Sequence, residues 1–117
     1  MSLAESLEAA AVAAGVHGFL PCTSSYACAH PSSQVVPLAS VVPPAQRTLL
    51  SHERAAAIFR AVAAGTRLPP VEVDCPPDST PGTYRLRNGF HRYHASAYLG
   101  FSHVPVVVLP YFSWNDL

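Results

Sequence analysis

The sequence contains no lysine, so arginine is its only permanently cationic side chain, and the seven arginines are balanced by seven acidic residues. The absence of lysine excludes a Schiff-base lysine and the phosphate-loop lysine of nucleoside triphosphatases. Nonspecific binding to a nucleic acid backbone needs a local excess of positive charge, which the balanced totals do not indicate. We therefore expect any bound phosphate to be held by arginine, histidine and backbone amides.

Cysteine is also scarce. Cys22, Cys28 and Cys75 are odd in number and lack the dense spacing of a secreted disulfide framework, which favours the reducing cytosol. The apolar segment 2–14 contains two glutamates, has no basic start and is too short to span a bilayer. We therefore interpret the chain as a cytoplasmic protein with neither a signal peptide nor a membrane segment.

Only 12% of the 117 residues are charged and 50% are hydrophobic, which is typical of a compact domain rather than a disordered chain. The length suits one domain. We predict a single globular α+β domain. Residues 1–33 would form an N-terminal helix and an irregular segment, and residues 34–117 the main body.

Caps and apolar periodicity indicate three helices. Ser2 and Glu5 form a capping box for a first helix that reaches residue 14. Ser51 caps a second helix, which carries apolar residues on one face and is closed by Gly65. A third helix is predicted over residues 91–99.

Short β-prone runs indicate the strands. We expect one strand ahead of the prolines at 43 and 44, because two prolines cannot continue a ladder. Alternation over 71–74 and 83–87 predicts a hairpin around a proline-rich turn. The nearly continuous apolar run 104–109 predicts a last strand buried on both faces.

A candidate phosphate site lies where the hairpin meets the last helix. Glycine permits a positive φ there, and the first amides of a helix have no partner within it and point at an anion. A helix-start arginine adds a charge-assisted contact, and histidine exchanges a proton near neutral pH. We expect the arginine to be a surface residue that contributes little to stability. The residues of this corner are Asn88, Gly89, Phe90, His91 and Arg92.

The same five residues fit a simpler interpretation. Many strand-to-helix turns contain Asn-Gly and an arginine that only solvates the surface, and so short a motif has many accidental matches. The residue pattern alone leaves both interpretations open.

A series of segments between residues 35 and 109 occurs in a recognisable order. They are Val-Val-Pro-Leu at 35–38, an amphipathic helix, Leu-Pro-Pro-Val-Glu-Val at 68–73, Tyr-Arg-Leu-Arg-Asn-Gly-Phe-His-Arg-Tyr-His-Ala at 84–95, and Gly100 followed by Val-Pro-Val at 104–106. In this order they resemble the ParB/sulfiredoxin superfamily, over about two thirds of the chain.

The resemblance implies a small mixed β-sheet flanked by helices and a nucleotide or polyphosphate site, with Gly89, His91 and Arg92 on phosphate. ATP or another nucleotide is the implied ligand, with Mg²⁺ as a candidate cofactor and phosphoryl transfer or hydrolysis as the implied reaction. Sulfiredoxins carry a catalytic cysteine where this chain has Phe90. Phenylalanine supplies no nucleophile, so we do not expect reduction of cysteine sulfinic acid.

Other members of the superfamily suggest further limits. ParB proteins follow this domain with a DNA-reading helix-turn-helix, and this sequence ends at Leu117, so we expect no DNA reading by this chain alone. Other small members of the superfamily resemble kinases of free serine, which contain an Asp-Gly-His-His-Arg segment. In this chain Asn88 stands in place of the aspartate of that segment and Phe90 in place of its first histidine. Glu53 is the central acid that could act as a base beside His91, although an acid at a helix start is more often only a favourable charge. The alternative function is a noncatalytic protein-interaction module on the same fold.

Two further groups of residues carry weaker hypotheses. The irregular segment contains side chains of the types that zinc prefers, at His17, Cys22, Cys28 and His30. Their spacing matches no compact ligand pair, so we predict no metal site. Three aromatic residues crowd the C-terminal tail, which either folds back on the domain or covers a protein partner such as a second copy; they are Tyr111, Phe112 and Trp114.

Overall fold

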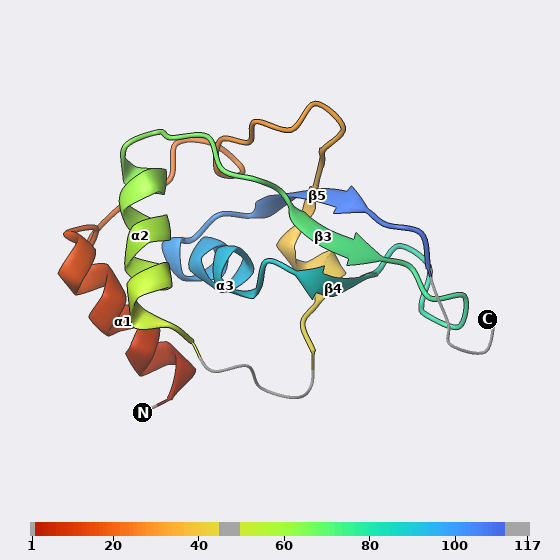
Figure 1. Ribbon diagram of the computed structural model, residues 1–117, viewed down its shortest axis with the longest axis horizontal. Helices are drawn as coiled ribbons and strands as arrows, with labels where there is room; N and C mark the ends of the chain where they lie inside the picture. The colour runs from red at the N-terminus through yellow and green to blue at the C-terminus, as the bar shows by residue number, and fades with distance from the viewer. Residues whose placement is uncertain (1, 45–49, 112–117) are drawn as a thin grey trace.

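The computed structural model describes residues 2–44 and 50–111. Within them the chain forms three α-helices, one 3-10 turn and five strands (Figure 1). In chain order these are α1 (Leu3–Ala14), β1 (Gln34–Pro37), the 3-10 turn η1 (Leu38–Ser40), β2 (Val41–Val42), α2 (His52–Ala63), β3 (Val71–Asp74), β4 (Tyr84–Asn88), α3 (Phe90–Leu99) and β5 (His103–Val108).

The strands form one mixed sheet in the order β1-β5-β3-β4-β2. β1 pairs antiparallel with β5, and β3 pairs antiparallel with β4 as the predicted hairpin. The pairs β3 with β5 and β2 with β4 are parallel. The α+β class and the small mixed sheet flanked by helices are therefore confirmed.

The helices begin where their caps predict. The Glu5 amide donates to the Ser2 hydroxyl at 3.1 Å and the Glu5 side chain accepts from the Ser2 amide, which completes the capping box of α1. At α2 the Arg54 amide donates to the Ser51 hydroxyl at 3.3 Å. These bonds satisfy amides that the helices leave without internal partners.

The three helices lie together at one end of the molecule, with α3 between α2 and the sheet (Figure 1). Tyr98 of α3 packs its ring against Phe59 of α2, with centroids 5.5 Å apart, and donates a hydrogen bond to Glu8 of α1. One core cluster combines α1 residues with the inner faces of the sheet and the other helices. The largest side chains of this cluster that are completely excluded from solvent are Phe59, Val71, Val73, Val104 and Val106.

Two details of the predicted strands are wrong. The region before the prolines holds two strands, β1 and β2, which lie at opposite edges of the sheet. β2 has two residues and is defined by its pairing with β4, which no local periodicity can reveal. The last strand ends at Val108 and is buried only over 104–106, because Val108 is 42% exposed.

The segment 16–33 contains no regular helix or strand, as predicted, but it is anchored to the body. Tyr26 is buried and its hydroxyl donates to the Pro69 carbonyl at 2.6 Å. Cys28 forms an isolated parallel bridge with Leu68. None of the helices that the structure describes is both long and apolar enough to cross a membrane.

Candidate functional site

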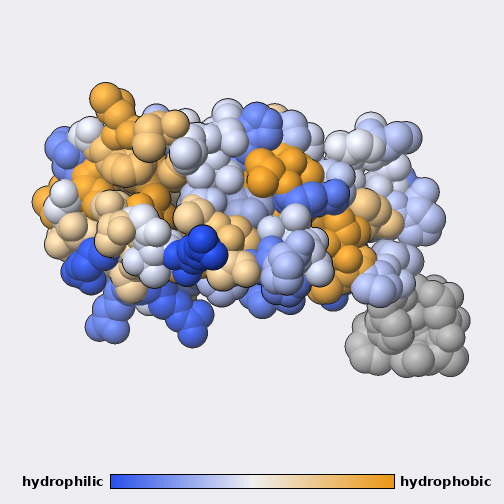
Figure 2. All heavy atoms as spheres, turned by 90° about the horizontal axis from the view of Figure 1, so that it is seen from above, coloured by the Kyte–Doolittle hydropathy of each residue, from blue (hydrophilic) through white to orange (hydrophobic). Residues whose placement is uncertain are grey.

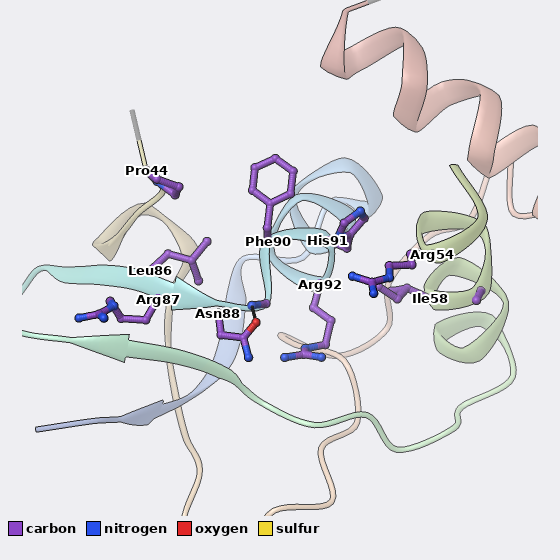
Figure 3. Close-up of a pocket in the computed structure, with 11 residues that line it drawn as sticks. Pro44, Arg54, Ile58, Leu86, Arg87, Asn88, Phe90, His91 and Arg92 are labelled. Atoms are coloured by element: carbon purple, nitrogen blue, oxygen red, sulfur yellow. Dashed lines mark hydrogen bonds between the residues drawn. The ribbon is translucent and has the colours of Figure 1, made fainter. Parts of the chain in front are cut away.

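A pocket of ≈ 530 Å³ lies between the first turn of α3, the end of β4 and one face of α2 (Figure 3). We call it the α2–α3 pocket. Its lining residues are Pro44, Arg54, Ala57, Ile58, Leu86, Arg87, Asn88, Gly89, Phe90, His91 and Arg92. The predicted strand-to-helix corner thus contributes all five of its residues to one cavity.

Gly89 is the N-cap of α3 and sits in the left-handed region at φ 101° and ψ 29°. A Cβ at this position would lie 2.8 Å from Val71 Cγ1 and 2.9 Å from Val71 Cβ. Glycine is therefore required both by the backbone conformation and by the lack of space. This packing places the first turn of α3 directly against β3.

The backbone amides at the start of α3 are available to a ligand. The first intrahelical bond runs from the Tyr93 amide to the Gly89 carbonyl at 2.8 Å, and Gly89 supplies no side-chain cap. The N–H groups of Phe90, His91 and Arg92 therefore have no acceptor among the described residues. Together with the helix dipole they form an anion-binding corner.

The Asn88 side chain is engaged within the protein. Its Nδ2 donates to Glu72 Oε1 at 3.1 Å, and its Oδ1 accepts from the Gly89 amide at 2.9 Å. These two bonds fix the end of β4 to β3 and stabilise the turn. Asn88 thus lines the pocket as a residue whose side chain is held by two hydrogen bonds within the protein.

The His91 side chain also forms a hydrogen bond within the protein. Its Nε2 accepts a hydrogen bond from the Ser51 amide at 2.8 Å, across 40 residues of sequence. Burial chiefly, and then the positive charges of Arg54 and Arg92, lower the pKa of His91 below its ordinary 6.5. The ring is therefore neutral at physiological pH and joins the start of α2 to the start of α3.

Arg92 leaves the first turn of α3 on the side opposite to Phe90 (Figure 3). Its Nη2 donates to the Pro70 carbonyl at 3.3 Å, while its Nε is buried and has no partner among the described residues. It also lines a second pocket of ≈ 330 Å³ on the far side of the corner. The expectation of a surface arginine is wrong, because the side chain is partly buried and contacts the segment before β3.

The remaining arginines of the pocket differ in whether they form an ion pair within the protein. Arg87 Nη1 donates to the buried Asp74 carboxylate at 2.7 Å, which also receives two bonds from Arg85. Burial would raise the pKa of Asp74, but the hydrogen bonds and charges of these two arginines outweigh it and lower the pKa below 3.8. Arg54 lies exposed on α2, and no residue that the structure describes forms an ion pair with it. Arg54 is therefore the most available cation of the pocket.

The other side of the pocket is apolar. Pro44, Ile58 and Leu86 line it, and the Phe90 ring lies edge-on to His94 with centroids 4.4 Å apart. The pocket therefore combines an apolar wall with a cationic rim. No carboxylate belongs to its described lining residues. Those residues do not fit a protein-bound Mg²⁺, which carboxylates would hold.

Several residues singled out in the sequence lie elsewhere. Glu53 is exposed on the first turn of α2 and does not line the pocket, so the structure does not bring it together with His91. Within the described residues no group of three or more potential ligand residues is placed to hold a metal ion. Tyr111 is 40% exposed, with its ring 5.8 Å from the Arg85 guanidinium carbon, whereas the rest of the aromatic tail lies outside the described residues.

Two pocket residues, Arg54 and Arg87, and one contact were not predicted from the sequence. Arg54 follows Glu53 in the first turn of α2, so its place near a helix start was a usable signal. Arg87 occupies an outward position of β4, which gives no indication of a site. The bond from Ser51 to His91 could not be found, because no local pattern links a helix cap to a residue 40 positions away.

Solved structures share the fold of this chain. ParB from Caulobacter crescentus complexed with CTP-γ-S matches with a TM-score of 0.57 and 22% identity over 69% of this chain and 46% of its own. Sulfiredoxin from Arabidopsis thaliana matches with a TM-score of 0.57 and 21% identity over 69% and 88%. A free serine kinase in complex with AMP matches with a TM-score of 0.58 and 23% identity over 82% and 38%.

These likenesses define the class of fold. The chain has the ParB/sulfiredoxin fold, as its sequence motifs predicted. It spans less than half of the ParB and serine kinase chains and most of the sulfiredoxin chain. No protein-family model matches the sequence, and no curated protein matches it.

Proposed function

We propose that this domain binds a nucleotide through its phosphates in the α2–α3 pocket. The proposal rests on two observations: the amides of Phe90, His91 and Arg92 have no acceptor among the described residues, and these residues line a cavity with arginines and no carboxylate in its described lining. Amides at a helix start and an available guanidinium are the groups that bind phosphate oxygens best. In this site Arg54 supplies the positive charge.

The class of ligand is supported by the size of the pocket and by proteins of the same fold. A volume of ≈ 530 Å³ lies within the range of small-molecule sites. The ParB structure contains CTP-γ-S, and the serine kinase structures contain AMP or ADP. The apolar wall of this chain's pocket suits the nonphosphate part of such a ligand.

Binding is better supported than catalysis. Phosphoryl transfer or hydrolysis needs a base within reach of the attacking group. Glu53 lies outside the pocket, and the Nε2 of His91 is occupied by the Ser51 amide. Phe90 offers no nucleophile. We therefore include no chemical step and no Mg²⁺ in the proposed function.

The second candidate is a noncatalytic interaction module, and exposed apolar residues favour it. Val35 and Val42 on the outer strands are 51% and 53% exposed, and Val12 on α1 is 59% exposed. On the face drawn in Figure 2, apolar side chains gather in separate groups with polar residues between them. Because a docking site is usually one continuous patch, these separate groups favour the interaction module less strongly than the pocket favours nucleotide binding.

A thermal-shift titration separates the two candidates. The protein is heated with ATP, ADP, CTP or inorganic pyrophosphate, each up to millimolar concentration. A ligand at 100 times its dissociation constant stabilises the fold by about 2.7 kcal/mol. For the ligand that shifts the wild type most, Arg54→Ala should remove most of the shift.

Arg60→Ala is the matched control, because Arg60 is also exposed on α2 but does not line the pocket. It should keep the full shift. The absence of a shift in the wild type with all four compounds would refute nucleotide binding and leave the interaction module. Equal losses in both arginine variants would show a general charge effect instead of a site.

A further inference from the structure

A chain of hydrogen bonds connects the two helices that border the α2–α3 pocket. The Ser51 amide donates to His91 Nε2 at 2.8 Å, and the Ser51 hydroxyl in turn accepts from the Arg54 amide at 3.3 Å. Ser51 is the N-cap of α2. The His91 ring is therefore linked, through one residue, to the backbone that carries Arg54.

The contact defines the protonation state of the ring. Nε2 can accept a hydrogen bond only while it is unprotonated, which places the single proton on Nδ1. The charged or titratable groups that act on His91 are Arg54 from α2 and Arg92 and His94 from α3. None of these three groups is an anion, so none of them stabilises an imidazolium.

We propose that His91 is a positioning residue that holds the start of α2 against the start of α3 and so places Arg54 over the phosphate-binding amides. In this arrangement His91 contributes its backbone amide to the anion, while its side chain contacts Ser51 and not phosphate. The inference rests on the proposed function for the role of Arg54. The contact between His91 and the start of α2 stands independently of any ligand.

The first test needs no ligand. Amide hydrogen exchange of residues 51–54, corrected for the intrinsic pH dependence of exchange, is compared in the wild type, His91→Ala and His91→Gln. Glutamine places an amide oxygen near the Nε2 position, so it can accept from Ser51 and stay uncharged. We expect exchange about fivefold faster in His91→Ala, the factor for loss of one buried hydrogen bond, and near wild-type exchange in His91→Gln.

The pH provides a second readout in the same experiment. Protonation of His91 removes the acceptor, so protection of residues 51–54 should decrease in the wild type as the pH falls below 6.5 and stay constant in His91→Gln. Equal protection in all three proteins at every pH would overturn the inference.

The third test measures coupling to Arg54 with ATP and with inorganic pyrophosphate as probes. Affinities are determined for the wild type, His91→Ala, Arg54→Ala and the double variant. If His91 acts through Arg54, His91→Ala should weaken binding about fivefold in the wild type and hardly at all once Arg54 is alanine. His91→Gln should restore the affinity.

The outcomes distinguish this inference from the proposed function. If His91→Ala lowers the affinity equally in the wild type and in Arg54→Ala, and His91→Gln does not restore it, His91 is a direct phosphate ligand. That result would overturn the positioning role. Binding that strengthens at low pH in the wild type but not in His91→Gln would do the same. If neither of these probes binds the wild type, and ADP and CTP do not bind it either, the proposed function fails, and the exchange experiment still decides whether His91 positions α2.

Discussion

Replacing Gly89 with alanine should lower the free energy of unfolding by about 3 kcal/mol, from two separate effects. The φ of 101° imposes a left-handed conformation that costs an L-residue about 1–2 kcal/mol. The new Cβ would also lie 2.8 Å from Val71 Cγ1, and Val71 is completely buried in β3. Overpacking of this kind costs about 1–3 kcal/mol.

For a chain of this length, 3 kcal/mol corresponds to a fall of about 12 °C in the midpoint of thermal unfolding, which circular dichroism measures directly. Gly82→Ala is the control, because Gly82 has a φ of 83° but no atom within 4 Å of its added Cβ. It should lose only the backbone part, about 4–8 °C. Equal losses in the two variants would refute the inference that the first turn of α3 packs directly on β3.

The remaining predictions concern two buried hydrogen-bonding groups. Asp74→Asn should lower the free energy of unfolding, measured with urea at pH 7, by about 2 kcal/mol. The loss is smaller than for a fully buried ion pair, because Arg85 and Arg87 are 44% and 45% exposed. Because the pKa of Asp74 is lowered, the difference from wild type should shrink as the pH falls from 3.8 through that folded-state pKa, and a constant difference would contradict the ion-pair explanation. Tyr26→Phe should cost about 1–2 kcal/mol and speed proteolysis within 16–33, because the Pro69 carbonyl loses its donor. Unchanged cleavage would show that this hydroxyl does not anchor the segment.

The parts of the fold that local chemistry determines could be predicted from the sequence. The capping box of Ser2 and Glu5, the cap at Ser51 and the alternation of the β3–β4 hairpin each involve residues close in the chain. β2 could not be predicted, because a strand of two residues exists only through its partner. The anchoring of Tyr26 to Pro69 spans 43 residues and was equally hidden.

The site shows the same division between local and distant determinants. The glycine that opens α3 and the exposed amides after it follow from the local sequence, and the structure places them as expected. The roles of the side chains did not follow, because Asn88, His91 and Arg92 contact Glu72, Ser51 and Pro70 from other elements. Sequence analysis could therefore locate the corner but could not tell which of its polar groups remain available to a ligand.

The two outer strands limit what the sheet can do outside the domain. β1 has four residues and ends at Pro37, and β2 has two residues followed by Pro43 and Pro44. Proline lacks a backbone donor, so each outer edge offers only a few free N–H and C=O groups to another chain. Despite the exposed valines on these strands, the sheet has little capacity to recruit further strands, and this protects the protein from growth into fibrils at high concentration.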